Sequence, residues 1–192
     1  MSEKENQRVM LTKRLLKESL LRLLQSKNIQ SISVKELCED SGINRATFYN
    51  HYGRPGDVLE ELEDEIIKNI PVISVAELKE NGSYKKAFIE QATILFEHLR
   101  NDKDFAALAR INGDSNSEFA MKIFNFPAIK KAIDDAAPDK YDETDRQLIF
   151  KYIQSGLYSM VREWIIIGTQ KSVNDTAELL AEIIDNGLVS QK

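Results

Sequence analysis

Arg45, Thr47, Tyr49 and His51 lie close together in the sequence and carry side chains that suit contacts with a nucleic acid. The Arg45 guanidinium can donate two parallel hydrogen bonds to a guanine in the major groove, and a phosphate contact is the alternative. Thr47, Tyr49 and His51 are better suited to phosphate oxygens, which set the register of a protein on DNA without reading its sequence. For Tyr49 and His51 the alternative is packing inside a small helical domain.

Two short helices are predicted to position these side chains. Ser33 and Glu36 have the spacing of a capping box, in which each side chain satisfies a backbone N–H at the start of a helix, here over 34–40. Gly42 then accepts the left-handed conformation that a tight turn between crossing helices needs. Asn44 is a suitable N-cap for the second helix, Arg45 to about His51. The expected apolar contacts come from Leu37, Ile43 and Phe48, with Cys38 as a small packing residue and not a nucleophile.

This arrangement is a helix-turn-helix, whose second helix lies in the major groove with its first residues towards base edges. The run Thr47-Phe48-Tyr49-Asn50-His51-Tyr52 resembles the Thr-hydrophobic-Tyr-x-His-Phe signature that ends the recognition helix of TetR-family regulators. The preceding Leu37–Ile43 resembles their Ile-Ala-x-x-(small)-Gly-Val stretch, and the resemblance covers about residues 8–70. It implies a DNA-binding homodimer, usually a repressor released by a small ligand. The predicted DNA contacts are Ser33, Lys35, Asn44, Arg45, Ala46, Thr47, Tyr49, Asn50, His51 and Arg54.

The chain departs from the family pattern after this motif. Most members continue with a lysine that meets a phosphate at the start of the fourth helix, whereas this chain has Gly53-Arg54-Pro55-Gly56-Asp57, with proline in the lysine's place. Pro55 suits the first position of a helix. Arg54 is the candidate that replaces the phosphate contact.

The whole chain is expected to be all-α, with the TetR-like fold and about nine helices. A three-helix DNA-binding domain is expected over 1–53, with 54–70 as a connector, and a ligand-binding and dimerisation domain over 71–192. Apolar residues at helical spacing predict the helices, and Ser172 is the expected N-cap of the last one. Their expected ranges are 7–27, 34–40, 45–51, 57–69, 84–100, 104–111, 118–124, 127–136, 142–168 and 173–188.

The segment from Tyr152 to Gly168 resembles the C-terminal region of one group of TetR-like proteins, which includes regulators of dihydroxyacetone kinase genes. The shared pattern is a mid-helix Gly, then Arg-x-Trp and a closing Gly before a Ser-capped final helix. Some members of such groups activate transcription, so the direction of regulation stays open. One face of the helix over 142–168 is predicted to lie in a dimer interface, in which this helix and the adjacent last helix pair with their twofold copies as a four-helix bundle; the alternative is the chain's own core. The predicted interface residues are Ile149, Ile153, Gly156, Met160, Trp164 and Ile167.

Aromatic residues are frequent in the middle of the chain, where they suit either a ligand pocket or an ordinary core. The effector itself cannot be identified from them. His98 is interpreted as a surface histidine or a core histidine with a hydrogen-bond partner. The pocket candidates are Phe88, Phe96, Phe105, Phe119, Phe124 and Phe126.

The composition favours a cytoplasmic protein. The 192 residues carry a net charge of −5, but residues 1–54 hold ten Lys+Arg against six Asp+Glu, a balance of +4, which leaves −9 for the rest. A basic start on an acidic body is typical of a protein whose first segment meets a polyanion, although ordinary surface variation is the alternative. No signal peptide or membrane span is apparent.

No catalytic group, metal cluster or cofactor loop is apparent in the sequence either, so an enzyme is not expected. The remaining alternative is a co-activator that works through protein contacts.

Overall fold

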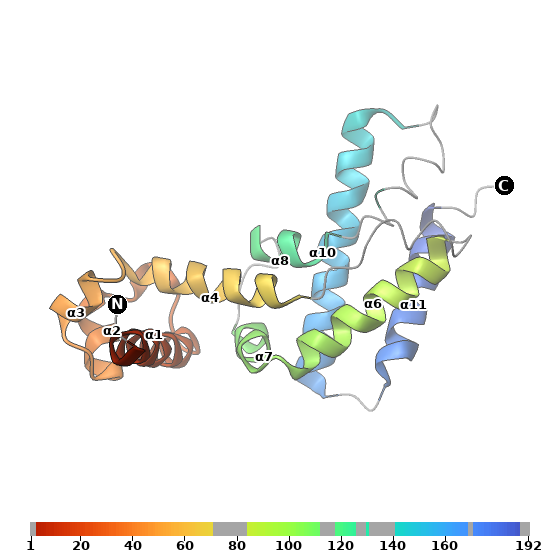
Figure 1. Cartoon of the computed structure of the whole chain (residues 1–192). Coiled ribbons are helices and arrows are strands. Elements are labelled where there is room, and N and C mark those ends of the chain that lie inside the picture. The colour runs from red at the N-terminus through yellow and green to blue at the C-terminus, as the bar shows by residue number, and fades with distance from the viewer. Residues whose placement is uncertain are drawn as a thin grey trace. The chain divides into compact units, whose positions relative to one another are not determined.

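The computed structural model describes residues 3–70, 84–111, 118–125, 130, 141–168 and 171–188, and these are helical with connecting turns and no strand (Figure 1). The all-α prediction is therefore confirmed for the described residues, and the number of helices is close to the expected one. The chain divides into two compact units. Unit 1 is Met1–Lys68 with Arg110–Asn112, and unit 2 is Asn69–Ala109 with Gly113–Lys192.

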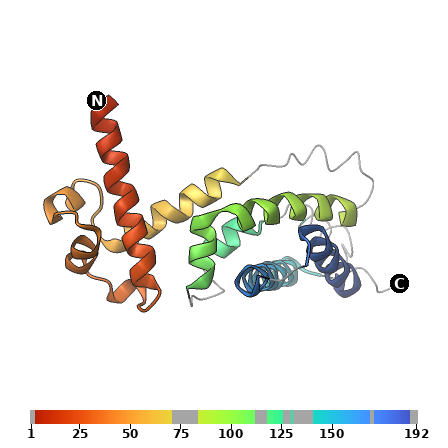
Figure 2. The same cartoon turned by 90° about the horizontal axis from the view of Figure 1, so that it is seen from below.

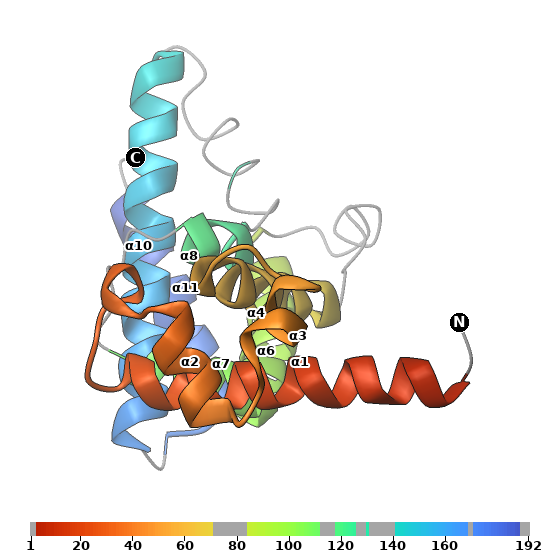
Figure 3. The ribbon, with the colours of Figure 1, turned by 90° about the vertical axis from the view of Figure 1, so that its left-hand side faces the viewer.

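Unit 1 is built on one long helix, against whose carboxyl-terminal half α2 packs (Figure 3). Leu16, Leu20 and Leu24 recur at intervals of four on that helix and are buried, so they form the side of the core that α1 contributes. The elements are α1 (Glu3–Leu24), the 3-10 turn η1 (Ile29–Ser31), α2 (Val34–Ser41), α3 (Arg45–Tyr49) and α4 (Pro55–Asn69).

The predicted helices of unit 1 are present, with shifted ends. The first begins at Glu3 and ends at Leu24, so the whole helix lies a turn earlier than the expected 7–27. Helix α3 ends at Tyr49, with Asn50 as its C-cap, and the His51 backbone N–H then donates to the Phe48 carbonyl three residues back, so the chain tightens into a turn.

The capping box expected at the start of α2 is only half formed. The Ser33 hydroxyl accepts the backbone N–H of Glu36 at 3.2 Å, as predicted. The Glu36 carboxylate does not return to the cap, because it pairs with the Lys27 ammonium instead. The ion pair offers the carboxylate a charged donor, which binds it more strongly than a neutral backbone N–H.

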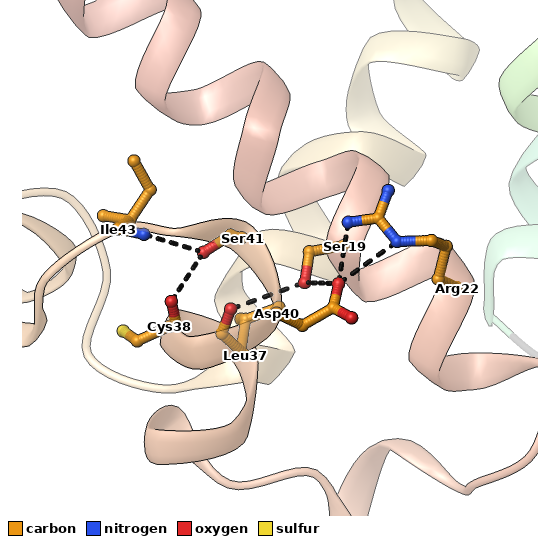
Figure 4. A network of polar contacts seen from close by, with 7 residues as sticks. All are labelled: Ser19, Arg22, Leu37, Cys38, Asp40, Ser41 and Ile43. Atoms are coloured by element: carbon orange, nitrogen blue, oxygen red, sulfur yellow. Dashed lines mark hydrogen bonds and ion pairs between the residues drawn. The ribbon is translucent and has the colours of Figure 1, made fainter.

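Asp40 fastens α2 to α1 through a small polar network (Figure 4). Its Oδ2 accepts a hydrogen bond from the Ser19 hydroxyl at 2.6 Å and from Arg22 Nη2 at 2.7 Å. Ser19 is fully buried and also reaches the Leu37 carbonyl at 3.4 Å. The hydrogen bonds from Ser19 and then Arg22 hold the pKa of Asp40 below its ordinary value.

Unit 2 has its core between α6 and α11, which lie side by side, and between α8 and α10 (Figures 1 and 2). The longest helix, α10, is closed at its start by a complete capping box of Asp142 with Asp145, and at its end by Gly168 in the left-handed conformation. Ser172 caps α11 by accepting the N–H of Asp175 at 3.0 Å, as predicted. The expected helix over 127–136 falls outside the described residues except at residue 130. The helices are α6 (Tyr84–Asn101), α7 (Lys103–Arg110), α8 (Glu118–Ile123), α10 (Glu143–Ile167) and α11 (Val173–Leu188).

Replacing Asp40→Ala is expected to lower the free energy of unfolding of unit 1 by about 1–2 kcal/mol, the scale of hydrogen bonds to a partly solvated charge. Because the pKa of Asp40 is lower in the folded chain, this contribution exists above about pH 4 and is lost as the pH falls through the folded pKa. Urea titrations at pH 7 and at pH 3 would measure both effects. The control is Glu39→Ala, whose carboxylate lies 3.8 Å from the Lys35 ammonium on the same helix. An equal loss of unfolding free energy for both variants would contradict the role of Asp40 in fastening α2 to α1.

Candidate nucleic-acid interface

The turn between α2 and α3 has the geometry that the sequence predicts. Gly42 has φ 70° and ψ 15°, in the left-handed region. The Ile43 backbone N–H donates to the Cys38 carbonyl at 3.1 Å and closes the end of α2. Asn44 then caps α3, because its Oδ1 accepts the Thr47 N–H at 2.7 Å.

Phe48 determines which side of α3 is presented to solvent. Its ring is fully buried, and it packs edge-on against Tyr49 and tilted against Tyr52, with centroid distances of 5.5 and 5.8 Å. Because α3 has one buried side, the opposite side carries exposed residues, among them Tyr49 with an exposed fraction of 59%.

The structure brings most of the predicted contact residues to the surface of unit 1. Thr47 and His51 are half-buried, and neither is a fully packed core residue. The exposed members of the predicted set are Ser33, Lys35, Asn44, Arg45, Ala46, Tyr49, Asn50 and Arg54.

Most of the basic side chains in residues 1–54 form ion pairs within unit 1. Arg22 pairs with Asp40 and Lys27 with Glu36, for example, so the net balance of residues 1–54 is not a free basic patch. Arg45, at the start of α3, has no ion pair within the described residues. Arg45 is therefore a better marker of the candidate interface than the net charge is. The paired basic residues are Lys13, Arg14, Lys17, Arg22, Lys27, Lys35 and Arg54.

The loop before α4 is organised by Asp57. One carboxylate oxygen accepts the backbone N–H groups of Gly53 and Arg54 at 2.8 and 3.0 Å, and the other accepts Arg54 Nε at 3.0 Å. The Arg54 hydrogen bond and then the Gly53 N–H keep the pKa of Asp57 below its ordinary value. Pro55 is the first residue of α4, as its fixed φ predicts. The Arg54 side chain stays 77% exposed, so its guanidinium is held in place and accessible.

Cys38 is a packing residue in this structure. It is 5% exposed beneath the turn. Burial raises the pKa of its thiol, partly offset by the nearby Arg45 charge, so the neutral form is favoured.

The predicted interface residues on α10 divide between two sides of the helix. Ile153 and Trp164 are each 8% exposed, and the Trp164 indole donates to the Lys171 carbonyl at 3.2 Å while Arg100 lies over its ring. They belong to the core of unit 2. Ile149 and Met160 are half-buried, and Gly156 and Ile167 are exposed.

The exposed stripe of α10 lies further round the helix than expected. Leu148 and Tyr152 are 62% and 80% exposed, and Gly156 continues their spacing of four. A Cβ built on Gly156 would meet nothing within 4 Å. On α11, Leu179 and Ile183 are also exposed, so both last helices carry apolar side chains towards solvent.

The aromatic candidates for a pocket fill the core of unit 2. The rings of Phe105 and Phe119 lie 6.3 Å apart, and Phe124 meets Tyr158 edge-on at 6.0 Å. Phe126 lies outside the described residues. The five described candidates, Phe88, Phe96, Phe105, Phe119 and Phe124, are all buried.

Two polar residues of α6 were missed or misjudged from the sequence. Gln91 is 4% exposed, and its Oε1 is buried without a hydrogen-bond partner in the described residues. His98 Nε2 is also buried without a hydrogen-bond partner in the described residues, so the partner that the sequence analysis expected for a core histidine is not found among them. The available signal was the position of Gln91, which interrupts the apolar stripe between Phe88 and Leu95. Such atoms need water or a ligand to offset the cost of burial.

The helices in the described part of the chain do not include a membrane span, because none is both long and apolar enough to cross a bilayer. Among those same residues, no three His, Cys, Asp or Glu side chains gather where they could hold a metal ion.

Comparison with known proteins places the chain among transcriptional regulators. A TetR-type family model described as "Transcriptional regulator C-terminal region" matches residues 87–186. No curated protein sequence matches the chain.

Two solved structures with TM-scores above 0.5 share the fold over almost their whole length. A TetR transcriptional regulator from Streptococcus agalactiae 2603V is 14% identical, with 96% of this chain and 99% of that chain covered and a TM-score of 0.59. A TetR-family regulator from Syntrophomonas wolfei str. Goettingen is 16% identical, with 94% and 96% covered and a TM-score of 0.60. The dihydroxyacetone kinase operon activator DhaS is 19% identical, with 93% and 97% covered and a TM-score of 0.47.

Proposed function

This chain belongs to the TetR family of transcriptional regulators, and from that premise we propose that it binds operator DNA as a homodimer and acts as a ligand-responsive repressor. The observation that carries the proposal is α3, a capped helix whose exposed side begins with Arg45, a cation without an ion pair in the described residues. The proposed role requires access to DNA, so we place the protein in the cytoplasm, and we propose no catalytic activity.

Each residue of the predicted contact set has a proposed role in DNA binding. Arg45 and Asn50 have the paired hydrogen-bonding groups that recognise guanine and adenine edges, and Ala46 suits a thymine methyl group. Tyr49 suits a phosphate oxygen. The remaining proposed phosphate contacts are Ser33, Lys35, Asn44, Thr47, His51 and Arg54.

The homodimer is proposed to form through the exposed faces of α10 and α11. Tyr152 on α10 and Ile183 on α11 are large apolar residues with exposed fractions of 80% and 52%, and Leu148 and Leu179 extend the exposed apolar surface of the two helices. Gly156 costs ~1 kcal/mol relative to alanine inside a helix, and nothing within the described part of the chain requires its lack of a side chain. Close approach of a second copy would use that space. Two copies also supply the two helix-turn-helix motifs that half-sites one helical turn apart require.

The effector site is proposed to lie in the core of unit 2, where Gln91 Oε1 and His98 Nε2 are buried without partners among the described residues. A bound molecule with a hydrogen-bond donor would satisfy the Gln91 carbonyl, and buried phenylalanines such as Phe88 would supply an apolar wall.

The alternative is an activator or co-activator that works mainly through protein contacts. The proline at the start of α4 favours it, since the family's usual phosphate-binding lysine is absent. Selection of duplexes from a random-sequence DNA pool by the purified protein separates the two. A regulator that contacts DNA enriches a sequence and binds it with an affinity that falls steeply with salt. Failure to enrich any duplex at low salt would refute direct DNA binding.

Arg45→Ala is expected to change which bases the selected duplex tolerates and to cost about 1–3 kcal/mol of binding free energy, because a bidentate base contact is lost. Tyr49→Phe and His51→Ala are expected to weaken all duplexes alike, since they remove phosphate contacts. Fluorescence anisotropy with the selected duplex and its single-base variants measures both. An Arg45→Ala protein with unchanged base preference would remove Arg45 from base readout.

Ile183→Glu is expected to convert the dimer into monomers, because it places a charge in a buried apolar interface. Gly156→Leu is expected to weaken the dimer while raising the helical stability of the monomer, since only a second copy would meet the new side chain. Sedimentation equilibrium measures the dimer constant and thermal unfolding the stability. Glu178→Gln, also exposed on α11, is the control. A dimer that tolerates Gly156→Leu would place the interface elsewhere.

A further inference from the structure

A compact cluster of charges joins α1 to α4 within unit 1. Glu61 receives one lysine on each carboxylate oxygen, with Lys13 Nζ at 2.7 Å from Oε2 and Lys17 Nζ at 2.9 Å from Oε1. Lys17 Nζ also lies 2.6 Å from Oε2 of Glu65, one turn further along α4. Glu61 is therefore the central member, since of the two carboxylates it is the one that contacts both lysines.

The cluster is partly shielded from water. The Lys17 side chain is only 11% exposed, and that of Glu61 is 29% exposed. Burial by itself would raise the pKa of Glu61, but the hydrogen bonds from Lys13 and Lys17 outweigh it and the pKa is lowered. The carboxylate is thus charged at neutral pH. Two ammonium groups and two carboxylates balance, which a poorly solvated group of charges requires.

Tyr52 connects this cluster to the recognition helix. Its ring is 6% exposed, lies 5.8 Å from the ring of Phe48 in α3, and has Lys13 Nζ 5.5 Å from its centroid. Burial and then the charge of Glu61 raise the pKa of the Tyr52 hydroxyl, so it stays protonated. The path from Glu61 through Lys13 and Tyr52 to Phe48 is therefore continuous.

We propose that Glu61 is a positioning residue for DNA binding: it holds Lys13 over Tyr52 and Lys17 against α4, and so keeps α3 in the orientation that meets the DNA. This inference rests on the proposed function. It adds that a residue outside the helix-turn-helix sets the fraction of molecules whose recognition helix is correctly placed.

The sign of the effect distinguishes positioning from simple electrostatics. A carboxylate near DNA repels the phosphates, so removing any negative charge from unit 1 should strengthen binding slightly. Removing Glu61 should weaken binding instead, because Lys13 then loses its carboxylate and Lys17 retains only Glu65.

The test compares Glu61→Gln with Glu60→Gln, which removes the same charge from the adjacent, exposed position of α4. Each full-length variant is titrated against the duplex that the wild-type protein selects, at 25 °C and constant salt. Glu61→Gln is expected to raise the Kd about tenfold, as a tenfold fall in the competent fraction would. Glu60→Gln is expected to leave the Kd unchanged or slightly lower. Circular dichroism and thermal unfolding establish that both are fully folded at that temperature.

Each outcome decides the proposal. A folded Glu61→Gln protein that binds as tightly as Glu60→Gln overturns it, because a residue that only stabilises the fold does not alter affinity well below the unfolding temperature. If Glu61→Gln does not fold, Glu65→Gln replaces it, since that side chain is 52% exposed and contacts only Lys17 of this cluster. A loss of affinity for Glu65→Gln that is smaller than tenfold supports the proposal. An unchanged affinity for Glu65→Gln overturns it. Wild-type protein that selects no duplex would refute the proposed function instead, and that result is visible before any variant is made.

Discussion

Helix α3, the proposed recognition helix, is too short to be stable without contacts outside itself. Helix α3 spans only Arg45–Tyr49, and a segment that short is not stable as an isolated helix. It persists because three features outside its own hydrogen bonds fix it: the Asn44 cap, the left-handed turn at Gly42 and the complete burial of Phe48. These features also determine orientation, since burying Phe48 leaves Arg45 and Tyr49 exposed. The other contacts of unit 1 can be understood as the support for the buried position of Phe48.

Local interactions in unit 1 could be predicted from the sequence, whereas interactions between distant segments could not. The caps at Ser33 and Asn44, like that at Ser172 in unit 2, join residues three apart, so residue type and spacing suffice to predict them. The ion pairs of Glu61 join residues 44 and 48 positions apart, and nothing in the sequence indicates which lysine meets which carboxylate. For the same reason Glu36 was expected to complete a capping box, when in the fold Lys27 is close enough to compete for it.

Helical periodicity predicted that α10 has apolar faces but not which face is turned inward. The helix is apolar around much of its circumference, so Ile153 and Trp164 fit the same stripe as Gly156. The structure separates them, because Trp164 is fixed by the Lys171 carbonyl and by Arg100 of α6, while Gly156 faces open space. Gln91 shows the same limit in α6, where a polar residue within an apolar stripe is buried with its carbonyl unpaired among the described residues.

The acidic character of α4 is compatible with DNA binding once its contacts are known. Its first turns carry several carboxylates, which by charge alone would oppose a polyanion. Asp57 instead organises the loop that presents Arg54, and Glu61 and Glu65 neutralise lysines of α1 at hydrogen-bonding distance. Together with the pairs that Asp40 and Glu36 make, these contacts occupy half of the ten cations that give residues 1–54 their positive balance. Net charge is thus a poor guide to the proposed interface: the charges of both signs mainly hold the unit together, and Arg45 on the exposed side of α3 is a cation outside these ion pairs.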